Sequence, residues 1–439
     1  MQKKIKINLV SLGCSKNTVD SESLAGELIS EGFSVQYNMQ KPSFNFVIIN
    51  TCGFIDKAKE ESINTILSFV ELKKQENKDF KIIVFGCLAQ RYKEELLKEI
   101  PEIDAIFGVM QQSKIISTIK EYRNTTKNTK PYFTRKLSNA KHYAYLKIAE
   151  GCNRRCSFCA IPLIKGNYVS RSIEDILEEA NELIEQGVKE LILIAQDTSC
   201  YGMDLYKKNR LKDLIVELSK TNIQWIRLQY SYPNQFPLEI LDLMTENSKL
   251  CHYIDMPLQH FNDRILASMN RNITGKEITE LISNIRNKVP DIALRTTLIV
   301  GYPEETKEEF GELENAIKNI QFDRMGAFTY SKEEGTKAAL LNDNISAKEK
   351  QKRLDELTDI QQEISFDLNQ KKIGKTFKVL IDCKEGEYFV GRTQYDSPEV
   401  DNEVLIPITE NVQIGNFYNI LITDAVEFDL YGRQIENAK

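Results

Sequence analysis

The chain has 439 residues, enough for two or three domains that each bury a core of their own. Its 58 Lys and Arg against 64 Asp and Glu give a net charge of −6, so no overall positive charge attracts it to nucleic acid. No apolar run resembles a signal peptide or reaches the length of a membrane span. Nine cysteines without a secretory signal favour metal chemistry in a reducing compartment, so we expect a cytoplasmic protein.

Residues 1–121 alternate short apolar runs with amphipathic stretches, and we expect them to form one domain. The strand-like runs are Ile5–Val10, Phe46–Ile49 and Ile82–Phe85. A helix follows the first run from Asn17 onward, and the next helix carries one apolar face at helical spacing, made of Ile63, Ile66, Leu67 and Val70. Strands that alternate with helices and are apolar throughout indicate an open parallel sheet covered on both faces.

One cysteine follows each of these three strand-like runs, namely Cys14, Cys52 and Cys87, and each has a glycine beside it. In an open parallel sheet the carboxyl ends of the strands share the edge where ligands bind, so three thiols from distant parts of the sequence can converge there on a metal centre. The alternative is that each cysteine is a small buried apolar residue, the commonest role of a free cysteine. The shared placement of all three favours the metal centre.

Residues 122–141 contain six Lys or Arg, no acidic residue and little apolar periodicity. This composition predicts a solvated basic linker between two domains. Contact with a phosphate backbone is the alternative.

The next motif places Cys152, Cys156 and Cys159 in a C-x3-C-x2-C array within eight residues. A strand would send alternate side chains to opposite faces, so the array is predicted to be a loop curled around a metal. Three thiolates can each bind one iron of a 4Fe–4S cluster and leave the fourth iron open to an external chelating molecule. Structural zinc normally needs four ligands, and the nearest histidine is His142, while a disulfide would leave an odd cysteine. We therefore favour the iron–sulfur cluster.

Residues 142–370 repeat the alternation of strands and helices and are predicted to form a second domain. The candidate strands are Tyr143–Ala149, Leu191–Ala195, Ile226–Gln229, Tyr253–Met256, Leu294–Val300 and Met325–Tyr330. Six such units predict a partial (β/α)6 barrel whose site lies at the carboxyl ends of its strands. A last helix begins at Ser346, which forms a predicted capping box with Glu349.

Polar residues follow several of these strands and are candidates for holding a cofactor: Gln196, Asp197, Gly301 and Pro303. For any single polar residue of these loops, a local hydrogen-bonding or capping role is the open alternative. His260 is the one histidine near a predicted strand end. We expect His142 and His252 to be surface or packing residues, and Cys200, Cys251 and Cys383 to be structural.

Residues 371–439 change to short alternating segments separated by turn-forming residues, which predicts a small antiparallel β-barrel. From Gly374 onward this part holds 12 acidic and 6 basic residues, so its net charge of −6 equals that of the whole chain. Phosphate backbones are bound through Lys and Arg, so RNA contact is not favoured. An acidic barrel suits a cationic protein partner, although solubility alone is an equal alternative.

Several motifs resemble one known family. Residues Cys152 to Cys159 resemble the signature of radical S-adenosylmethionine enzymes, and the segments Cys159–Pro162, Lys165–Gly166 and Ser170–Arg171 resemble their methylthiotransferase branch. The resemblance covers essentially the full chain. It implies an auxiliary 4Fe–4S cluster at Cys14, Cys52 and Cys87, a radical S-adenosylmethionine core and a final TRAM-like barrel. Gly301–Tyr302–Pro303 is close to the family's glycine-rich motif beside the cofactor, but Glu304 stands where the family commonly has Gly.

The resemblance implies two 4Fe–4S clusters and S-adenosylmethionine as cofactors. The cluster at Cys152, Cys156 and Cys159 would cleave S-adenosylmethionine to a 5′-deoxyadenosyl radical, which removes hydrogen from an unactivated carbon. The auxiliary cluster would carry the sulfur, a second S-adenosylmethionine would methylate it, and the substrate radical would collect the methylthio group. No side chain of the protein is expected to be catalytic, because the cofactors carry the chemistry.

The segments Asp197–Ser199 and Tyr230–Pro233 look more like the RimO-type branch, which acts on the β-carbon of an aspartate in small-subunit ribosomal protein number twelve. Ribosomal proteins are typically basic, so the acidic barrel points the same way. The alternative substrate is transfer RNA adenosine, as in the MiaB-type branch. A non-catalytic iron–sulfur scaffold or redox sensor is the alternative from a different class. The sequence does not identify the electron donor or the sulfur donor.

Overall fold

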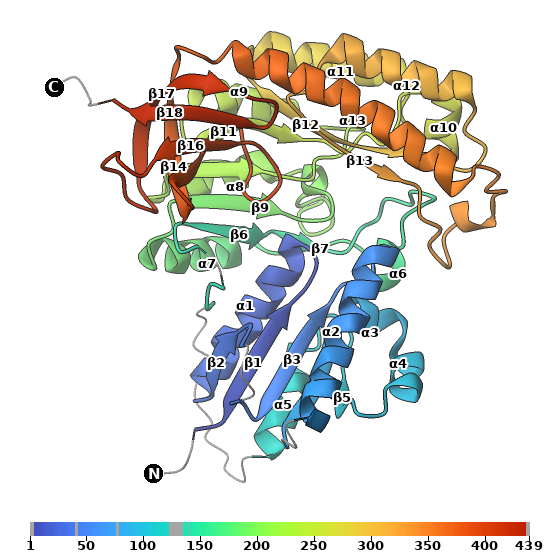
Figure 1. Cartoon of the computed structure of the whole chain (residues 1–439), viewed down its shortest axis with the longest axis vertical. Helices are drawn as coiled ribbons and strands as arrows, with labels where there is room; N and C mark the ends of the chain where they lie inside the picture. Colours follow the sequence, from blue (N-terminus) through green and yellow to red (C-terminus); the bar gives the residue numbers. More distant parts are fainter. Residues whose placement is uncertain (1–3, 40–42, 76–78, 123–134, 139, 436–439) are drawn as a thin grey trace. The chain divides into compact units, whose positions relative to one another are not determined.

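The computed structural model describes residues 4–39, 43–75, 79–122, 135–138 and 140–435. It divides into two compact units (Figure 1). The first unit comprises residues 1–139, 151–153 and 160–167, and the second comprises residues 140–150, 154–159 and 168–439. Most of the predicted linker, residues 123–134 and 139, lies outside the described residues. None of the described helices has the combined length and apolar character that a bilayer crossing requires.

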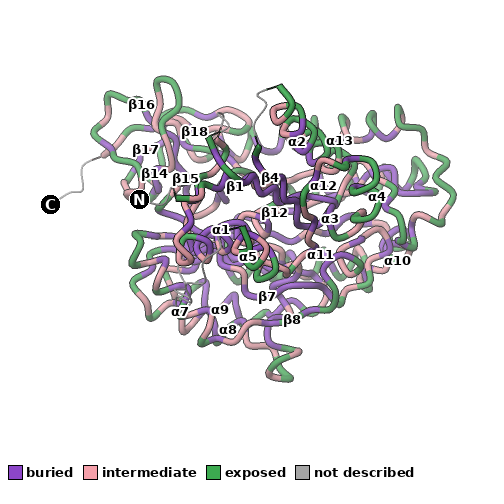
Figure 2. Tube along the Cα trace, turned by 90° about the horizontal axis from the view of Figure 1, so that it is seen from below, coloured by how far each residue is buried: buried purple, intermediate pink, exposed green. Residues whose placement is uncertain are grey.

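The described part of the first unit contains a parallel sheet, as predicted, and this sheet has five strands in the order β2-β1-β3-β4-β5. Its strands are β1 (Lys6–Ser11), β2 (Ser34–Tyr37), β3 (Phe46–Thr51), β4 (Lys81–Gly86) and β5 (Ala105–Ile106). The helices of this unit are α1 (Ser15–Ser30), α2 (Asp56–Gln75), α3 (Cys87–Arg91), α4 (Lys93–Glu99), α5 (Gln112–Glu121) and α6 (Ile161–Lys165). Figure 2 shows β4 buried along most of its length, as expected of a central strand that is apolar on both faces.

Two apolar clusters lie on opposite faces of this sheet, because successive strand residues point to opposite sides. Leu9 and Ile48 pack with α1 and α5, whereas Val47 and Ile49 pack with α2. The predicted apolar face of α2 is narrower than its pattern indicated. The buried face of α2 consists of Ser62, Ile66 and Val70. Ile63 and Leu67 lie beside this face and are 37% and 40% exposed.

One basic residue of the predicted linker is not solvated, so the expectation of a solvated strip was wrong for Arg135, although Lys141 is exposed. Arg135 is buried and lies 2.5 Å from the carboxylate of Glu22 on α1, and Ser138 donates to the same carboxylate. A buried carboxylate needs a cation and hydrogen-bond donors, and Arg135 and Ser138 supply them. Basic composition alone cannot distinguish such a partner from a solvated charge.

The described part of the second unit contains a six-stranded parallel sheet in the order β13-β12-β11-β10-β9-β6, which confirms the partial barrel. Its strands are β6 (Tyr143–Lys147), β9 (Glu190–Ile194), β10 (Trp225–Leu228), β11 (Leu250–Asp255), β12 (Ala293–Val300) and β13 (Arg324–Thr329). The short strands β7 (Ala149–Glu150) and β8 (Val169–Ser170) pair beside it. The helices are α7 (Ile173–Glu185), α8 (Leu211–Ser219), α9 (Glu239–Glu246), α10 (Asp263–Ser268), α11 (Gly275–Lys288), α12 (Lys307–Ile320) and α13 (Ala347–Gln370).

The helix α13 packs against β13 and α12 (Figure 1). Its predicted capping box is only half formed. The Ser346 hydroxyl accepts from the Glu349 amide at 3.2 Å, but the Glu349 carboxylate pairs with Arg353 at 3.3 Å. A nearby cation thus competes with the N-terminal amide for the same carboxylate.

The last 66 residues contain the expected small barrel, closed in the order β14-β15-β16-β18-β17. Its strands are β14 (Thr376–Glu385), β15 (Tyr388–Thr393), β16 (Glu403–Pro407), β17 (Phe417–Ala425) and β18 (Asp429–Gln434). Four of the pairings are antiparallel as predicted, but β16 and β18 pair in parallel. That pairing closes the sheet and removes its free edges.

Candidate functional site

Three thiols of the first unit lie at the carboxyl ends of neighbouring strands. Cys14 follows β1 and precedes α1, Cys52 follows β3, and Cys87 follows β4 as the first residue of α3. These strands are adjacent in the sheet, so the three residues share one edge. A Cβ at Gly13, next to Cys14, would lie 2.6 Å from the Cys52 Cβ, and a Cβ at Gly53, next to Cys52, would lie 3.0 Å from the Cys87 carbonyl carbon. The structure therefore brings together the three cysteines that the sequence singled out.

Two glycines allow the loops at this edge to approach one another. A Cβ at Gly13, where φ is +88°, would lie 2.6 Å from the Cys52 Cβ and 2.9 Å from its Sγ. A Cβ at Gly86, where φ is +102°, would lie 2.4 Å from Asn50 Oδ1. Any larger residue would strain the backbone and push the thiol loops apart.

Buried polar side chains, which the sequence analysis missed, hold the same loops. Asn17 Nδ2 donates to Leu12 O at 2.8 Å, and Asn50 Nδ2 donates to Asn17 O at 2.9 Å. Ser62 on α2 accepts from the Cys52 amide and donates to the Cys52 carbonyl, both at 3.0 Å. An isolated Asn or Ser carries no such signal in the sequence, because only the folded loops bring its backbone partner within hydrogen-bonding distance.

Replacing Ser62 with alanine should lower the free energy of unfolding by about 1–3 kcal/mol, because it leaves the buried Cys52 amide without an acceptor. Urea denaturation of the metal-free protein measures the change. Ser68→Ala is the matched control, since Ser68 donates to Thr65 O at 2.7 Å on the exposed side of the same helix. We expect the control to change stability by less than about 0.5 kcal/mol. Equal losses in the two variants would contradict the role of Ser62.

Burial dominates the acid–base properties of these thiols. It raises the pKa of Cys52, and it raises the pKa of Cys87 to about 12, with Lys165 acting in the opposite direction. Without metal, Cys87 is therefore a protonated thiol at neutral pH. A thiol must lose its proton to ligate iron, and the metal supplies the driving force for that loss. Lys165, which is buried beside Asp20 at 3.4 Å, adds a positive charge that favours the thiolate.

The second thiol motif is a loop whose middle is anchored to the second unit. The Cys159 amide donates to Cys156 O at 3.2 Å, which makes the turn that the spacing predicted. Ser157 Oγ donates to Ser268 O at 2.7 Å and lies 2.9 Å from the Tyr302 hydroxyl. In the first unit, the Cys152 amide donates to Gly166 O at 3.1 Å. Tyr302, from the glycine-rich motif after β12, thus braces the thiol loop, a role that its sequence position did not reveal.

The four residues predicted to hold a cofactor lie past strand ends, and they differ in what they contact. Gln196 Nε2 donates to Glu150 at 2.7 Å, and Asp197 accepts from Arg154 at 2.8 Å. A Cβ at Gly301 would lie 2.4 Å from the Lys350 side chain, and Pro303 is buried. Their contact with a cofactor stays a prediction.

At the carboxyl-end edge of the six-stranded sheet in the second unit, several buried polar atoms have no hydrogen-bond partner among the described residues. They lie beyond the ends of four strands and are Gln196 Oε1, Ser231 Oγ, His260 Nε2 and Tyr330 Oη. Burial lowers the pKa of His260 to about 3, so its ring is neutral at physiological pH. Buried polar atoms are normally paired, and a gathering of unpaired ones is what a polar ligand would satisfy. The edge therefore fits a cofactor rich in amino, carboxylate and hydroxyl groups.

Three non-glycine residues that follow the carboxyl ends of β10, β11 and β12 adopt the left-handed backbone conformation. They are Tyr230, Gln259 and Glu304, with φ of +61°, +79° and +66°. Each such residue costs on the order of 1–3 kcal/mol, and such strain gathers where function requires it. The sequence resemblance led us to expect glycine at the position of Glu304, and a φ of +66° is a conformation that glycine adopts without steric cost.

Among the described residues, no three His, Cys, Asp or Glu side chains converge as ligands of a single metal ion. A mononuclear zinc site needs such convergence. In a 4Fe–4S cluster each thiolate bonds a different iron, so the sulfur atoms lie further apart. The metal held by Cys14, Cys52 and Cys87 therefore stays a prediction.

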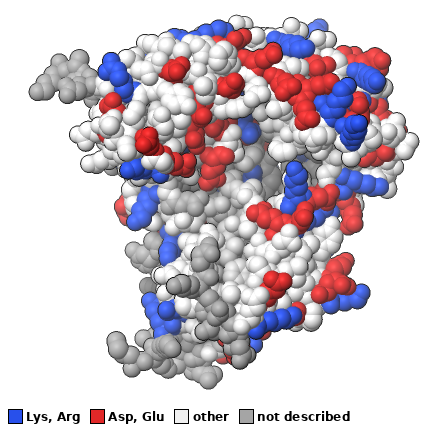
Figure 3. Space-filling model, viewed as in Figure 1, with Lys and Arg blue, Asp and Glu red and all other residues white. Residues whose placement is uncertain are grey.

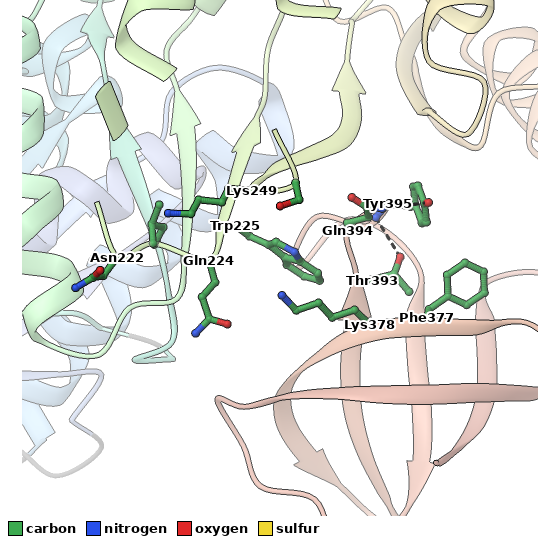
Figure 4. Close-up of a pocket in the computed structure, with 11 residues that line it drawn as sticks. Asn222, Gln224, Trp225, Lys249, Phe377, Lys378, Thr393, Gln394 and Tyr395 are labelled. Atoms are coloured by element: carbon green, nitrogen blue, oxygen red, sulfur yellow. Dashed lines mark hydrogen bonds between the residues drawn. The ribbon is translucent and has the colours of Figure 1, made fainter. Parts of the chain in front are cut away.

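The second unit also contains a cavity of about 480 Å³, which does not lie at the carboxyl ends of the strands of its sheet (Figure 4). It lies at the amino ends of β10 and β11, beside the small barrel, where Trp225, Lys249 and Lys378 line it. Lys249 Nζ donates to Ser219 O and Thr221 O, and Lys378 Nζ lies 4.3 Å from the Phe417 ring centroid. Internal contacts thus occupy its cations, and parallel barrels bind cofactors at the opposite end.

Comparison with known proteins agrees with this arrangement. Residues 146–317 match the Radical SAM superfamily, residues 6–108 match an uncharacterized protein family, UPF0004, and residues 373–435 match the TRAM domain. A radical S-adenosylmethionine methyltransferase from Kitasatospora setae, TsrM, with cobalamin and a [4Fe-4S] cluster bound, shares the fold with a TM-score of 0.56. The match has 14% identity and covers 77% of each chain. The match to the Radical SAM superfamily, together with the thiol motif, places this chain among the radical S-adenosylmethionine enzymes, which use an iron–sulfur cluster.

The full-length relatives narrow the class. The ribosomal protein uS12 methylthiotransferase RimO of Christiangramia forsetii is 50% identical over 99% of this chain and 95% of its own length. The proteins of the same name from Cytophaga hutchinsonii and Bacteroides thetaiotaomicron are 49% and 48% identical, with 98% of each covered. The chain belongs to the RimO family of methylthiotransferases.

Proposed function

We propose that this protein adds a methylthio group to the β-carbon of an aspartate in the ribosomal protein uS12, in the cytoplasm. The proposal is supported by full-length similarity to proteins named for that activity. The observation that carries it is the grouping of Cys14, Cys52 and Cys87 on one edge of the first sheet, in addition to the C-x3-C-x2-C loop. One cluster suffices for radical chemistry, so a second thiol set is what sulfur transfer adds.

In this proposal the chain holds two 4Fe–4S clusters. Cys152, Cys156 and Cys159 would hold one cluster, which would supply the electron for cleavage of S-adenosylmethionine, and Cys14, Cys52 and Cys87 would hold an auxiliary cluster, which would supply sulfur. Residues 142–370 form the radical core, residues 1–121 the domain of the auxiliary cluster, and residues 371–439 the TRAM-like barrel. The support comes from the residue types and from the C-x3-C-x2-C spacing along the chain.

In this proposal, the side chains of the protein position the thiol loops and the cofactor. Ser157 and Tyr302 fix the turn of the thiol loop, and Asn17, Asn50 and Ser62 fix the auxiliary loops. Gln196 is proposed to bind S-adenosylmethionine through its unpaired Oε1, and Gly301 and Pro303 to shape the backbone beside it. Asp197 acts on the cofactor site through Arg154, which it holds at 2.8 Å. These contacts place and enclose the reactants, and such a site excludes water from radical chemistry.

The small barrel is proposed to attract the basic protein substrate, but fewer of its acids are available than the sequence suggested. Asp382, Asp396, Asp401 and Glu399 pair with arginine, histidine or tyrosine side chains of the second unit. Others face outward. Glu403 and Asp429 lie opposite each other in the β16–β18 register, and burial followed by the charge of Asp429 raises the pKa of Glu403. Acidic side chains are also frequent on the visible face of the second unit (Figure 3).

Neutralising this outward pair, with Glu403→Gln and Asp429→Asn together, should slow association with uS12 about threefold to tenfold at low salt. The difference should shrink as ionic strength rises. Stopped-flow association with labelled uS12 at several salt concentrations measures it. Glu94→Gln with Glu95→Gln removes the same charge from exposed positions on α4 and serves as the control. An equal slowing in both double variants would contradict a docking role for the barrel.

The proposed function is tested with anaerobically reconstituted protein, reductant, S-adenosylmethionine and sulfide. Purified uS12 and unmodified transfer RNA are offered in separate reactions, and each product is examined by mass spectrometry. A methylthio group on an aspartate of uS12 supports the proposal. Modification of transfer RNA adenosine alone would assign the chain to the other branch of methylthiotransferases. Clusters that stay bound and reducible, without cleavage of S-adenosylmethionine in any reaction, would favour a scaffold or sensor.

A further inference from the structure

The ring of Tyr232 carries two guanidinium groups next to the thiol loop. Arg154 belongs to the loop itself, and its Cζ lies 4.1 Å from the centroid of the Tyr232 ring. Arg271 follows α10, and its Cζ lies 4.2 Å from the same centroid. Cation–π contacts of this length hold a guanidinium at a defined height over the ring. Tyr232 thus fixes two cations from separate elements of the second unit beside Cys156.

Arg271 reaches the sulfur of Cys156 directly. Its Nη1 lies 3.5 Å from Cys156 Sγ, and the Tyr232 hydroxyl lies 4.0 Å from that sulfur. Two further contacts hold the arginine: its Nη2 donates to Pro257 O, and its carbonyl accepts from the Tyr232 hydroxyl at 2.9 Å. The side chain therefore has one geometry, and in that geometry a donor points at one thiol.

The charge of Arg271 is not balanced in the way that the charge of Arg154 is. Arg154 pairs with Asp197 at 2.8 Å. Arg271 is only 4% exposed, makes no ion pair with a carboxylate of the described residues, and its Nε has no hydrogen-bond partner among them. A buried cation without a counter-charge is costly. A thiolate at Cys156 is the negative charge that would compensate it.

We propose that Arg271 is a positioning residue that donates a hydrogen bond to the Cys156 thiolate and makes the cluster of this loop easier to reduce. The inference rests on the proposed ligation of that cluster by Cys156. Reduction adds one negative charge to the cluster. A fixed cation that donates an N–H···S hydrogen bond therefore stabilises the reduced cluster more than the oxidised cluster. Hydrogen bonds to the sulfurs, net charge and exposure set the potentials of such clusters. Tyr232 and Pro257 maintain the geometry.

The test is the midpoint potential of the cluster, measured by electron paramagnetic resonance during redox titration of the reconstituted full chain. All variants are compared in a Cys14→Ala background, so that the proposed auxiliary cluster adds no signal. Arg271→Gln should make reduction about tenfold less favourable, which is about 59 mV for one electron, with iron and sulfide unchanged. Arg271→Lys keeps the positive charge but lacks the planar set of guanidinium donors, so its midpoint potential should lie between those of the parent and Arg271→Gln.

Arg264→Gln is the matched control, because Arg264 lies at the start of α10, is half exposed and pairs with Glu309. Its potential should equal that of the parent. An Arg271→Gln variant with full iron content and an unchanged potential would overturn the inference. Loss of iron in both Arg271→Gln and Arg271→Lys would overturn it as well, because the arginine would then hold the loop together without tuning the cluster. A wrong assignment of the cluster ligands would give a different result. In that case Cys156→Ala would bind as much iron as the parent protein.

Discussion

Replacing Cys14 with alanine should lower the iron content of the reconstituted protein from about eight to about four atoms per chain, with an equal fall in acid-labile sulfide. The remaining cluster should still cleave S-adenosylmethionine, while methylthio transfer to uS12 should fall below detection. The physical reason is that Cys14 shares one sheet edge with Cys52 and Cys87 and lies in a different sequence region from the C-x3-C-x2-C loop. The two thiol sets should therefore load and fail independently.

Cys156→Ala supplies the complementary result, since it should remove the other four irons and abolish cleavage while leaving the auxiliary set loaded. Cys383→Ala is the control, because Cys383 lies on β14 of the small barrel and should change neither metal content nor activity. A Cys14→Ala protein that keeps its full iron content would show that these three thiols do not hold a cluster. Zinc without sulfide in the parent would contradict both assignments.

The second large effect concerns the buried charges that attach the small barrel to the core sheet within the second unit. Glu190 on β9 lies 2.7 Å from Arg227 and 2.8 Å from Arg392, which belongs to β15. Arg392 also pairs with Asp382 at 2.5 Å. Both side chains of the Glu190–Arg227 pair are fully buried. Glu190→Ala would leave two buried guanidinium groups short of a partner and should cost about 3–5 kcal/mol of stability.

Thermal or urea unfolding measures this loss, with Glu217→Ala as the control. Glu217 pairs with Lys220 on an exposed turn of α8, so its removal should change stability by at most about 0.5 kcal/mol. Comparable effects of the two substitutions would contradict the role of the Glu190 pair.

The same carboxylate gives a pH signature. Burial by itself raises the pKa of Glu190, but Arg392 and Arg227 hold that pKa below its ordinary value of 4.5. A group whose pKa is lower in the folded state stabilises the fold above the unfolded value, and that stability is lost as the pH falls through the folded value. Stability should therefore fall on acidification below about pH 4.5, and Glu190→Ala should flatten that part of the curve.

Much of the architecture could be predicted because it depends on local patterns. The apolar runs of β3 and β4 and the alternation with helices indicated two parallel sheets, and the turn-rich texture after Gly374 indicated the barrel. The shorter strands β2 and β5 were missed, since four residues and two residues carry too little pattern. The parallel β16–β18 pair was missed as well, because pairing direction depends on how the barrel closes and not on either strand alone.

The candidate site divides in the same way. Six cysteines stand beside glycines, strand ends or one another in the chain, so their grouping follows from the sequence and from parallel topology. Arg271, Tyr302, Ser62 and Glu190 show no such pattern, because each acts on a partner that only folding brings near. The acidity of the barrel was also misleading in part, since four of its acids are used internally.

The sequence by itself determined which atoms can bind metal, since thiol chemistry and short loop spacing are properties of neighbouring residues. The tertiary structure alone decided which charges and hydroxyl groups surround those thiols: Lys165 near Cys87, Arg271 and Tyr232 near Cys156, and Ser62 at Cys52. The physical reason is that ligation depends on residue type, whereas the properties of a bound cluster depend on burial and on the distances to groups far away in the chain.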